Sequence, residues 1–147
     1  MPDRNYLEWP FFEPRHRELA KAIADWTAKN VAAAVGKHPH STDVDNTCRR
    51  FVRQLGEAGW LRHAIAGKVH GGAEDSIDTR AICLIREALA YHSGLADFCF
   101  ALQGLGSGAI SLFGSDAQKQ KYLPGVVKGE SIAALAISEV NAGSDVA

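Results

Sequence analysis

The stretch from Leu95 to Phe113, LADFCFALQGLGSGAISLF, decides the fold. It is long enough for about five helical turns, and it is apolar on nearly all sides. A helix without a polar face belongs at the centre of a bundle. Three glycines, Gly104, Gly106 and Gly108, stand at alternate positions within it. Each costs about 0.8–1.0 kcal/mol of helix propensity relative to alanine, so the spacing indicates close approach by another helix or a ligand. No strand precedes the glycines and their spacing is not G-x-G-x-x-G, which excludes a dinucleotide-binding loop.

A first helix is expected well upstream of this stretch. Pro14 suits its first position, because the N–H that proline lacks would be unsatisfied there. Apolar residues then recur near every 3.6 positions up to Val35. Gly36 and the turn His38-Pro39-His40 stop the helix. The two histidines could bind a metal, but no carboxylate or cysteine stands at a ligand spacing nearby, so we predict a solvated turn and no metal site.

Two further helices are expected between this turn and Leu95. The second begins at Ser41 or Thr42 with acidic residues in its first turn, where they favour the helix dipole, and Gly59 ends it. The third is capped by Ser76 and carries apolar residues every three or four positions. These helices, together with the central one, predict an all-α fold.

The character of the sequence changes after the central helix. Ser115 and Gln118 have capping-box spacing and start a short fifth helix, which Pro124 ends or kinks. Beyond Gly129, the run SIAALAIS from Ser131 to Ser138 is either a buried strand or a helix fragment. We favour a strand, although nothing earlier in the sequence looks like a partner strand for it.

Composition limits the function. The chain has 147 residues, 46% hydrophobic and 22% charged, with a net charge of −1. This balance is typical of a globular domain and disfavours nucleic-acid binding. We expect no membrane span, no signal peptide and a reducing, cytoplasmic setting, since Cys48, Cys83 and Cys99 are odd in number and widely spaced. The cysteines fall on predicted apolar faces and are expected to be unreactive.

Other polar groups give mostly structural interpretations. Arg86 and Glu87 are expected to form a helix-surface or interface pair, and the lysines of the fifth helix a solvated face. The run Ser138-Glu-Val-Asn-Ala-Gly-Ser-Asp145 differs because it directly follows the expected strand. Gly143 allows close approach of a phosphate, and Ser144 with neighbouring N–H groups can donate to an anion.

Four stretches together resemble the acyl-CoA dehydrogenase family, in the family's order and over nearly the whole chain. They are Leu55-Gly-Glu-Ala-Gly-Trp60, Gly104-Leu-Gly-Ser-Gly108, Phe113-Gly-Ser-Asp-Ala-Gln-Lys-Gln-Lys-Tyr-Leu-Pro124 and Ala136-Ile-Ser-Glu-Val-Asn-Ala-Gly-Ser-Asp145. The last is the most specific, although Val140 stands where the family usually has proline. The resemblance implies an N-terminal helical domain over residues 1–129 and the start of a β-barrel-like middle domain over 130–147.

The resemblance also implies an activity. The family removes the α-proton of an acyl-CoA thioester with a carboxylate base and passes hydride from the β-carbon to N5 of FAD. It implies an acyl-CoA substrate, an electron-transfer acceptor and a homo-oligomer, usually a tetramer. The catalytic glutamate of the family lies in later helices or their loops, and neither Glu87 nor Glu139 matches it. We therefore expect no catalytic residue in this chain, no turnover by it alone, and weak or absent FAD binding.

The resemblance assigns cofactor residues at the end of the chain. Leu135 and Ile137 match strand positions along the flavin, and Ser138 matches the Thr/Ser that hydrogen-bonds the isoalloxazine near N5. Gly143 and Ser144 match the turn that meets the FAD pyrophosphate, and Ser144 also borders the path of the substrate.

For the acyl pocket, Asp97, Phe98 and Ala101 match the lining by position alone. Two alternatives stay open. The chain could be a standalone helical interaction or dimerisation module, or it could belong to a relative such as an acyl-CoA oxidase or a nitroalkane oxidase.

Overall fold

The computed structural model describes residues 4–37 and 43–144. Within these ranges the regular elements are all helices and no strand is formed, so the predicted all-α class is confirmed. The elements, in chain order, are η1 (Asn5–Glu8), α1 (Pro14–Lys37), α2 (Val44–Glu57), η2 (Trp60–Ala64), η3 (Lys68–His70), α3 (Thr79–His92), α4 (Gly94–Phe113) and α5 (Asp116–Val127), where η marks a 3-10 helix.

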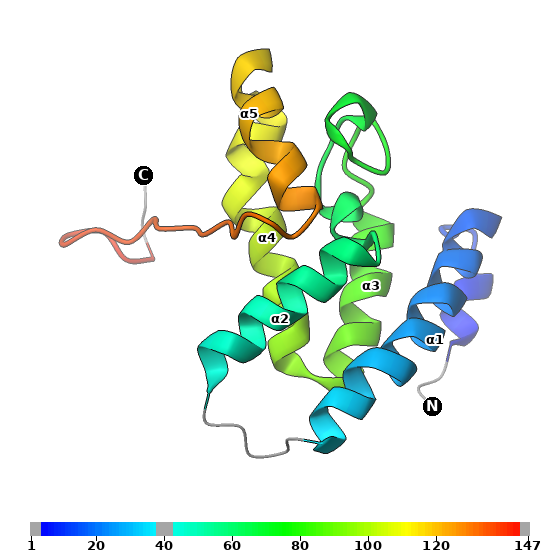
Figure 1. The fold of residues 1–147 in the computed structure, drawn as a ribbon. Helices are drawn as coiled ribbons and strands as arrows, with labels where there is room; N and C mark the ends of the chain where they lie inside the picture. Colours follow the sequence, from blue (N-terminus) through cyan, green and yellow to red (C-terminus); the bar gives the residue numbers. More distant parts are fainter. Residues whose placement is uncertain (1–3, 38–42, 145–147) are drawn as a thin grey trace.

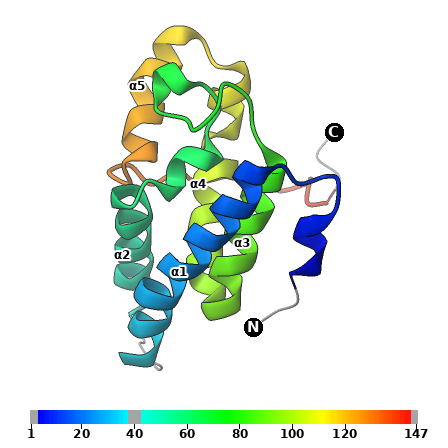
Figure 2. The same ribbon diagram turned by 90° about the vertical axis from the view of Figure 1, so that its right-hand side faces the viewer.

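α4 lies at the centre of the bundle, as its sequence predicted (Figure 1). It packs against α2, α3, α5 and η2, while α1 packs on α3, and Figure 2 shows α1 and α3 running side by side. The core between these helices consists of apolar side chains with essentially no exposed surface, among them Ile23, Leu55, Ile85, Leu89 and Phe100. Burying each such side chain contributes about 1.5–3 kcal/mol, and this burial holds the bundle together.

The first two helices begin close to where the sequence placed them. α1 begins at Pro14, as predicted, and ends at Lys37, one residue past the glycine expected to stop it. The cap of α2 is Asp43, whose carboxylate accepts a backbone N–H of the first turn at 3.1 Å. Ser41 and Thr42, the predicted caps, lie outside the described residues.

The start of α3 corrects the prediction. Ser76 was expected to cap this helix, but it lies in the preceding loop, and the cap is Asp78. One oxygen of Asp78 accepts the backbone N–H groups of Arg80 and Ala81 at 3.1 and 3.2 Å. A carboxylate at this position satisfies two unpaired donors and also complements the helix dipole, so it displaces the serine two residues earlier.

Two other boundary signals are confirmed, and a third, Pro124, lies inside α5 instead of ending it. Gly59 has a φ of 78°, the left-handed conformation that ends α2. Ser115 and Gln118 form the capping box of α5, with bonds of 3.3 and 2.8 Å. Pro124 does not end α5, because it lies in the last turn, where its own carbonyl still accepts the N–H of Lys128 at 3.2 Å.

The strand expected over residues 131–138 is not formed. This segment leaves the bundle in an irregular, extended path (Figure 1). Leu135 and Ile137 remain 48% and 56% exposed. A strand needs a neighbour to receive its backbone hydrogen bonds, and the described part of the chain offers none, which explains the difference.

One helix, α4, is long and apolar enough by length and composition to cross a membrane, with 20 residues and a hydropathy of 1.3. No membrane span was expected, and among the described residues this helix is the one stretch that meets the length and hydropathy test for one. The central helix of a bundle passes the same test, and α4 contacts four other elements. α4 is accordingly weak evidence for a membrane span.

Candidate functional site

The outer face of α4 exposes a row of large apolar side chains. Phe98, Leu105 and Leu112 recur along it at 56%, 57% and 53% exposure. Three polar side chains of the helix lie on its inner face instead: Gln103, Ser107 and Ser111 are at most 3% exposed. Large apolar side chains spaced along one exposed helix face are typical of a surface that meets a ligand or another apolar element.

An apolar cavity of about 320 Å³ lies beside this outer face. It is formed between α4, the start of α3 and η2. Its lining residues are Ala64, Ile77, Ile82, Arg86, Phe100, Ala101, Gly104, Leu105, Gly108 and Leu112. Arg86 is the only charged residue among them, so the cavity suits an aliphatic or aromatic group and offers little to a polar one.

Arg86, in the lining of the cavity, is engaged in an ion pair with Asp97. Its guanidinium donates to both carboxylate oxygens of Asp97 at 2.8 and 2.9 Å. The hydrogen bond that Arg86 donates to Asp97 raises the pKa of the guanidinium further above its usual range. Of the predicted acyl-site residues, Ala101 lines the cavity, Phe98 stands on the same exposed face of α4, and Asp97 orients the arginine at the cavity wall.

The three glycines of α4 have three different environments. A Cβ on Gly104 would stand 3.3 Å from the Cβ of Ala64 in η2. A Cβ on Gly106 would stand 2.5 Å from the backbone nitrogen of Ala134. Gly108 faces open space beside the cavity. The predicted close approach is therefore confirmed at Gly104 and Gly106. At Gly106 the neighbour is the irregular C-terminal segment of the chain.

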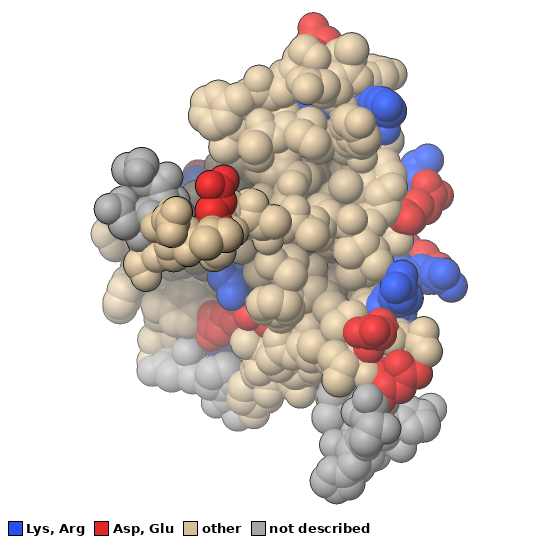
Figure 3. Space-filling view, turned by 90° about the vertical axis from the view of Figure 1, so that its left-hand side faces the viewer, with Lys and Arg blue, Asp and Glu red and all other residues tan. Residues whose placement is uncertain are grey.

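The predicted cofactor residues all lie on the C-terminal segment and are exposed. Ser138, Gly143 and Ser144 are open to solvent, as are Leu135 and Ile137. The structure does not gather these five residues into an enclosed pocket. Figure 3 shows the side from which the segment projects, and the centre of that face carries few charged side chains.

Gln103 is a site residue that the sequence analysis missed. Its side chain is 1% exposed and bonds the backbone of the C-terminal segment at Ser131 and Ala133. The available signal was a single amide inside the otherwise apolar run from Cys99 to Leu105, because a buried amide needs several hydrogen-bond partners.

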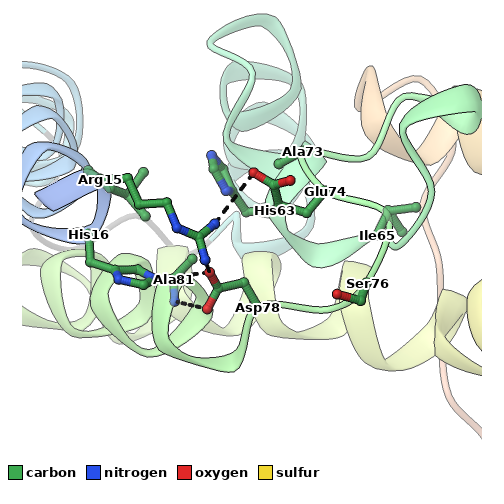
Figure 4. A pocket seen from close by; sticks show the side chains of 10 residues that line it. Arg15, His16, His63, Ile65, Ala73, Glu74, Ser76, Asp78 and Ala81 are labelled. Atoms are coloured by element: carbon green, nitrogen blue, oxygen red, sulfur yellow. Dashed lines mark hydrogen bonds and ion pairs between the residues drawn. The ribbon is translucent and has the colours of Figure 1, made fainter. Parts of the chain in front are cut away.

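A second, charged cavity of about 120 Å³ lies where α1 meets α3 (Figure 4). His16 is 1% exposed. Its Nδ1 accepts the backbone N–H of Glu13 at 3.0 Å, so the ring proton is on Nε2, which donates to Asp78 at 2.9 Å. Arg15 bridges Asp78 at 3.0 Å and Glu74 at 3.5 Å. Each charge meets an opposite one, which indicates a structural clasp between two helices.

The environment of Asp78 agrees with this structural role. Burial acts to raise the pKa of its carboxyl, but the hydrogen bonds from His16 and from the backbone of Ala81, together with the charge of Arg15, outweigh burial and lower the pKa. The carboxylate therefore stays ionised, and it is unsuited to act as a general base at neutral pH.

The remaining candidates carry no chemistry. Burial raises the pKa of Cys99 to about 12, and Cys48 is half-buried, but Cys83 is exposed and not on the apolar face expected for it. Glu87 accepts a hydrogen bond from Tyr6, whereas Arg86 binds Asp97, so each of the two residues expected to form a pair has a different partner.

Within residues 4–37 and 43–144 no group of three His, Cys, Asp or Glu side chains could hold a metal. The turn His38-Pro39-His40 lies outside these ranges.

Residues 13–130 match the family model described as "Acyl-CoA dehydrogenase, N-terminal domain". The chain therefore belongs to the acyl-CoA dehydrogenase family and contains its N-terminal helical domain. This result agrees with the fold and with the apolar cavity beside α4.

Individual relatives give the same family. A probable acyl-CoA dehydrogenase of Bacillus subtilis (strain 168) is 33% identical over 138 residues, which cover 91% of this chain and 22% of that protein. The mitochondrial isovaleryl-CoA dehydrogenase of Pongo abelii is 34% identical over 131 residues, which cover 88% of this chain and 30% of that protein.

A crystal structure of an acyl-CoA dehydrogenase complexed with FAD from Bacillus anthracis superposes with a TM-score of 0.76 at 31% identity. It covers 92% of this chain, and the match spans 22% of that chain. The chain thus spans between about a fifth and a third of the length of these relatives.

Proposed function

We propose that the chain is the N-terminal part of an FAD-dependent acyl-CoA dehydrogenase, with residues 1–129 as its helical domain and 130–147 as the start of a middle β domain. The enzyme would convert a saturated acyl-CoA to its trans-2-enoyl product. The observation that carries this proposal is the apolar cavity beside the exposed face of α4 in a chain of this family.

In this proposal α4 supplies one wall of the acyl site. Ala101 borders the cavity, and Phe98 and Leu105 extend the same apolar face. Burying each methylene of an acyl chain there contributes about 0.8 kcal/mol. Asp97 acts through Arg86: its carboxylate accepts two hydrogen bonds from the guanidinium and balances the one charge in the cavity lining.

The C-terminal segment fits one wall of a flavin site. No backbone hydrogen bond joins residues 134–138 to the rest of the described chain, so their polar groups are free to meet a cofactor ring. Leu135 and Ile137 present apolar surface, and Ser138 an exposed hydroxyl. FAD, when bound, supplies the acceptor for hydride.

The turn that follows suits a phosphate group. A Cβ on Gly143 would meet nothing within 4 Å, so its backbone is open to close approach. The exposed hydroxyl of Ser144 adjoins it and can donate to an anion. We assign this pair to the FAD pyrophosphate, with Ser144 also beside the path of the substrate.

The base would come from residues outside this chain. α3 and α4 contain one carboxylate each, and both are engaged, Glu87 by Tyr6 and Asp97 by Arg86. We therefore expect the chain alone to be inactive and to bind FAD weakly or not at all. The whole enzyme would act in the cytoplasm as a homo-oligomer that binds acyl-CoA and passes electrons to an electron-transfer acceptor.

A chimera tests the proposal. Residues 1–147 replace the matching N-terminal part of the Pongo abelii isovaleryl-CoA dehydrogenase, and the product is assayed for flavin absorbance and for acceptor reduction with acyl-CoA. We expect a yellow, active chimera and no acceptor reduction by the chain alone. A folded chimera that binds no flavin, or reduction by the isolated chain, would contradict the proposal.

A second candidate is a helical interaction module, favoured by the exposed Ile132, Leu135 and Ile137 on an unpaired segment. Such an edge invites pairing with a second copy. In this case the chain alone would be a dimer, and Leu135→Lys or Ile137→Lys would make it a monomer. Under the enzyme proposal these two variants instead weaken flavin binding by the chimera, so sedimentation of the chain and absorbance of the chimera separate the two functions.

A further inference from the structure

The side-chain amide of Gln103 is the most highly satisfied buried polar group on α4. Its nitrogen donates to the carbonyl of Ser131 at 2.9 Å and to that of Val126 at 3.4 Å, and its oxygen accepts the N–H of Ala133 at 2.7 Å. An amide buried without partners would be strongly destabilising. Here the partners are the end of α5 and the first residues of the C-terminal segment.

The geometry of these bonds is that of strand pairing. One amide accepts from the N–H of Ala133 and donates to the carbonyl two residues earlier, at Ser131. A parallel neighbouring strand offers its backbone amides to a chain in the same alternation. Gln103 thus takes the place of the partner strand that the described chain lacks, but only for the first residues of the segment.

Gly106, less than one helical turn further along α4, completes the contact. An added Cβ would stand 2.5 Å from the nitrogen of Ala134 and 2.8 Å from the carbonyl carbon of Ala133. Backbone atoms this close leave no room for a side chain. The segment therefore crosses directly over the helix at Gly106 while Gln103 holds its register.

We propose that Gln103 and Gly106 are the positioning residues of the C-terminal segment: they fix where it leaves the helical domain and so where Ser138 enters the cofactor site. Ser138 follows Ala133 by five residues, which span at most about 17 Å when fully extended. The clamp therefore limits the region that the serine can reach. The clamp itself is independent of the proposed function, and only its consequence for the flavin rests on that function.

Amide hydrogen exchange of the 147-residue chain, followed by NMR, tests the clamp. Gln103→Met keeps the size of the side chain but removes all three hydrogen bonds. We expect the Ala133 amide to exchange about tenfold faster or more, while the Leu89 amide in the core remains strongly protected. Equal Ala133 exchange in this variant and the wild type overturns the proposal.

A pair of glycine variants controls for helix stability. Gly106→Ala and Gly108→Ala both raise helix propensity, but only the first places a methyl group against the segment. We expect faster Ala133 exchange in Gly106→Ala and wild-type exchange in Gly108→Ala. The same exchange in both variants contradicts the role of Gly106, and this readout remains available if Gln103→Met fails to fold.

Gln103→Glu separates positioning from a merely structural role through its pH profile. A protonated glutamic acid has the shape of glutamine, and it can accept from Ala133 and donate to Ser131. The carboxylate form cannot donate and faces two carbonyl oxygens. At each pH, the exchange rate of the Ala133 amide in Gln103→Glu is compared with that in wild type. The variant should protect this amide as well as wild type does at low pH, and should lose the protection as the glutamate ionises.

If the ratio of the Ala133 exchange rates in Gln103→Glu and in wild type does not change with pH, the proposal is overturned. Because exchange is measured without flavin or acyl-CoA, this result does not depend on the fate of the proposed enzyme function. In the flavin-binding chimera, the same three variants at Gln103 and Gly106 should weaken flavin binding if Ser138 depends on the clamp. Unchanged binding there overturns the consequence for Ser138.

Discussion

In an ordinary amphipathic helix the polar side chains are exposed and the apolar ones are buried. Along two faces of α4 this arrangement is reversed. The inner face carries Gln103 and Ser111, both buried, whereas the outer face carries Phe98 and Leu105, both more than half exposed. The inner polar groups are all bonded: Ser111 Oγ, for example, accepts the N–H of Ala66 at 2.9 Å. Gln103 and Ser111 bond backbone N–H groups of irregular segments, which need partners that an apolar side chain cannot supply.

This difference shows that burial along α4 follows the hydrogen-bonding needs of its neighbours. Exposing a large apolar side chain forgoes about 1.5–3 kcal/mol of burial. Three such residues along one face indicate that this surface meets another apolar group, which in our proposal is the acyl chain. The comparison predicts that substitutions on the inner face cost stability and that substitutions on the outer face do not.

The largest expected effect is at Phe100, which is 1% exposed on the inner side. Phe100→Ala should lower the free energy of unfolding by about 3–5 kcal/mol, because it removes buried surface and leaves a cavity. Phe98→Ala, two residues away and 56% exposed, should change it by less than about 1 kcal/mol. Urea unfolding of both variants checks this, and similar losses would break the comparison.

The next largest effect concerns Asp78, the N-cap of α3, whose carboxylate binds His16 and Arg15 of α1. Asp78→Ala should cost about 2–4 kcal/mol, since it removes a helix cap and leaves the Nε2–H of buried His16 without a partner. Thermal unfolding measures the loss. A loss below about 1 kcal/mol would mean that the clasp between α1 and α3 is not structural.

Asp78 also predicts a pH dependence. Its pKa is lowered below the ordinary 3.8 in the folded protein. The resulting stabilisation is therefore fully present above pH 3.8 and is lost as the pH falls through the lowered pKa. Asp78→Asn, which can still cap α3, should be less stable than wild type at neutral pH and should approach it in acid. A difference in stability between Asp78→Asn and wild type that does not change with pH would contradict the lowered pKa of Asp78.

A smaller effect compares two serines of the inner face. Ser111→Ala leaves the buried N–H of Ala66 unsatisfied and should cost about 1–3 kcal/mol. Ser107 donates to the carbonyl of Gln103 within the same helix, and that carbonyl keeps its helical partner, so Ser107→Ala should cost less than about 1 kcal/mol. Equal losses in chemical denaturation would show that the partner outside the helix is unimportant.

The smallest expected effect is a gain. Gly108→Ala should raise stability by about 0.8–1.0 kcal/mol, because the new methyl group meets open space and the helix loses a glycine. In the flavin-binding chimera the same variant should weaken binding of the acyl group, since Gly108 borders the cavity. A gain in stability without any effect on the ligand would separate this cavity from the acyl site.

Much of the helical architecture could be predicted because its signals are local. Pro14, Gly59 and the pair Ser115 and Gln118 act through their own backbone or the next turn, so each was recognised without knowing the fold. The cap of α3 was assigned to Ser76 instead of Asp78, because the ion pair and histidine contact that favour Asp78 come from α1. The strand over 131–138 was wrong because its apolar pattern requires a partner that the described chain does not contain.

The sequence alone determined the helices, the central place of α4 and the resemblance to a family, since periodicity, caps and ordered motifs are written along the chain. Only the tertiary structure decided which face of α4 is buried, which glycine admits a neighbour, and that Gln103 holds the C-terminal segment. These outcomes depend on contacts between residues distant in sequence. An apolar helix has no local signal to say which of its faces such contacts will cover.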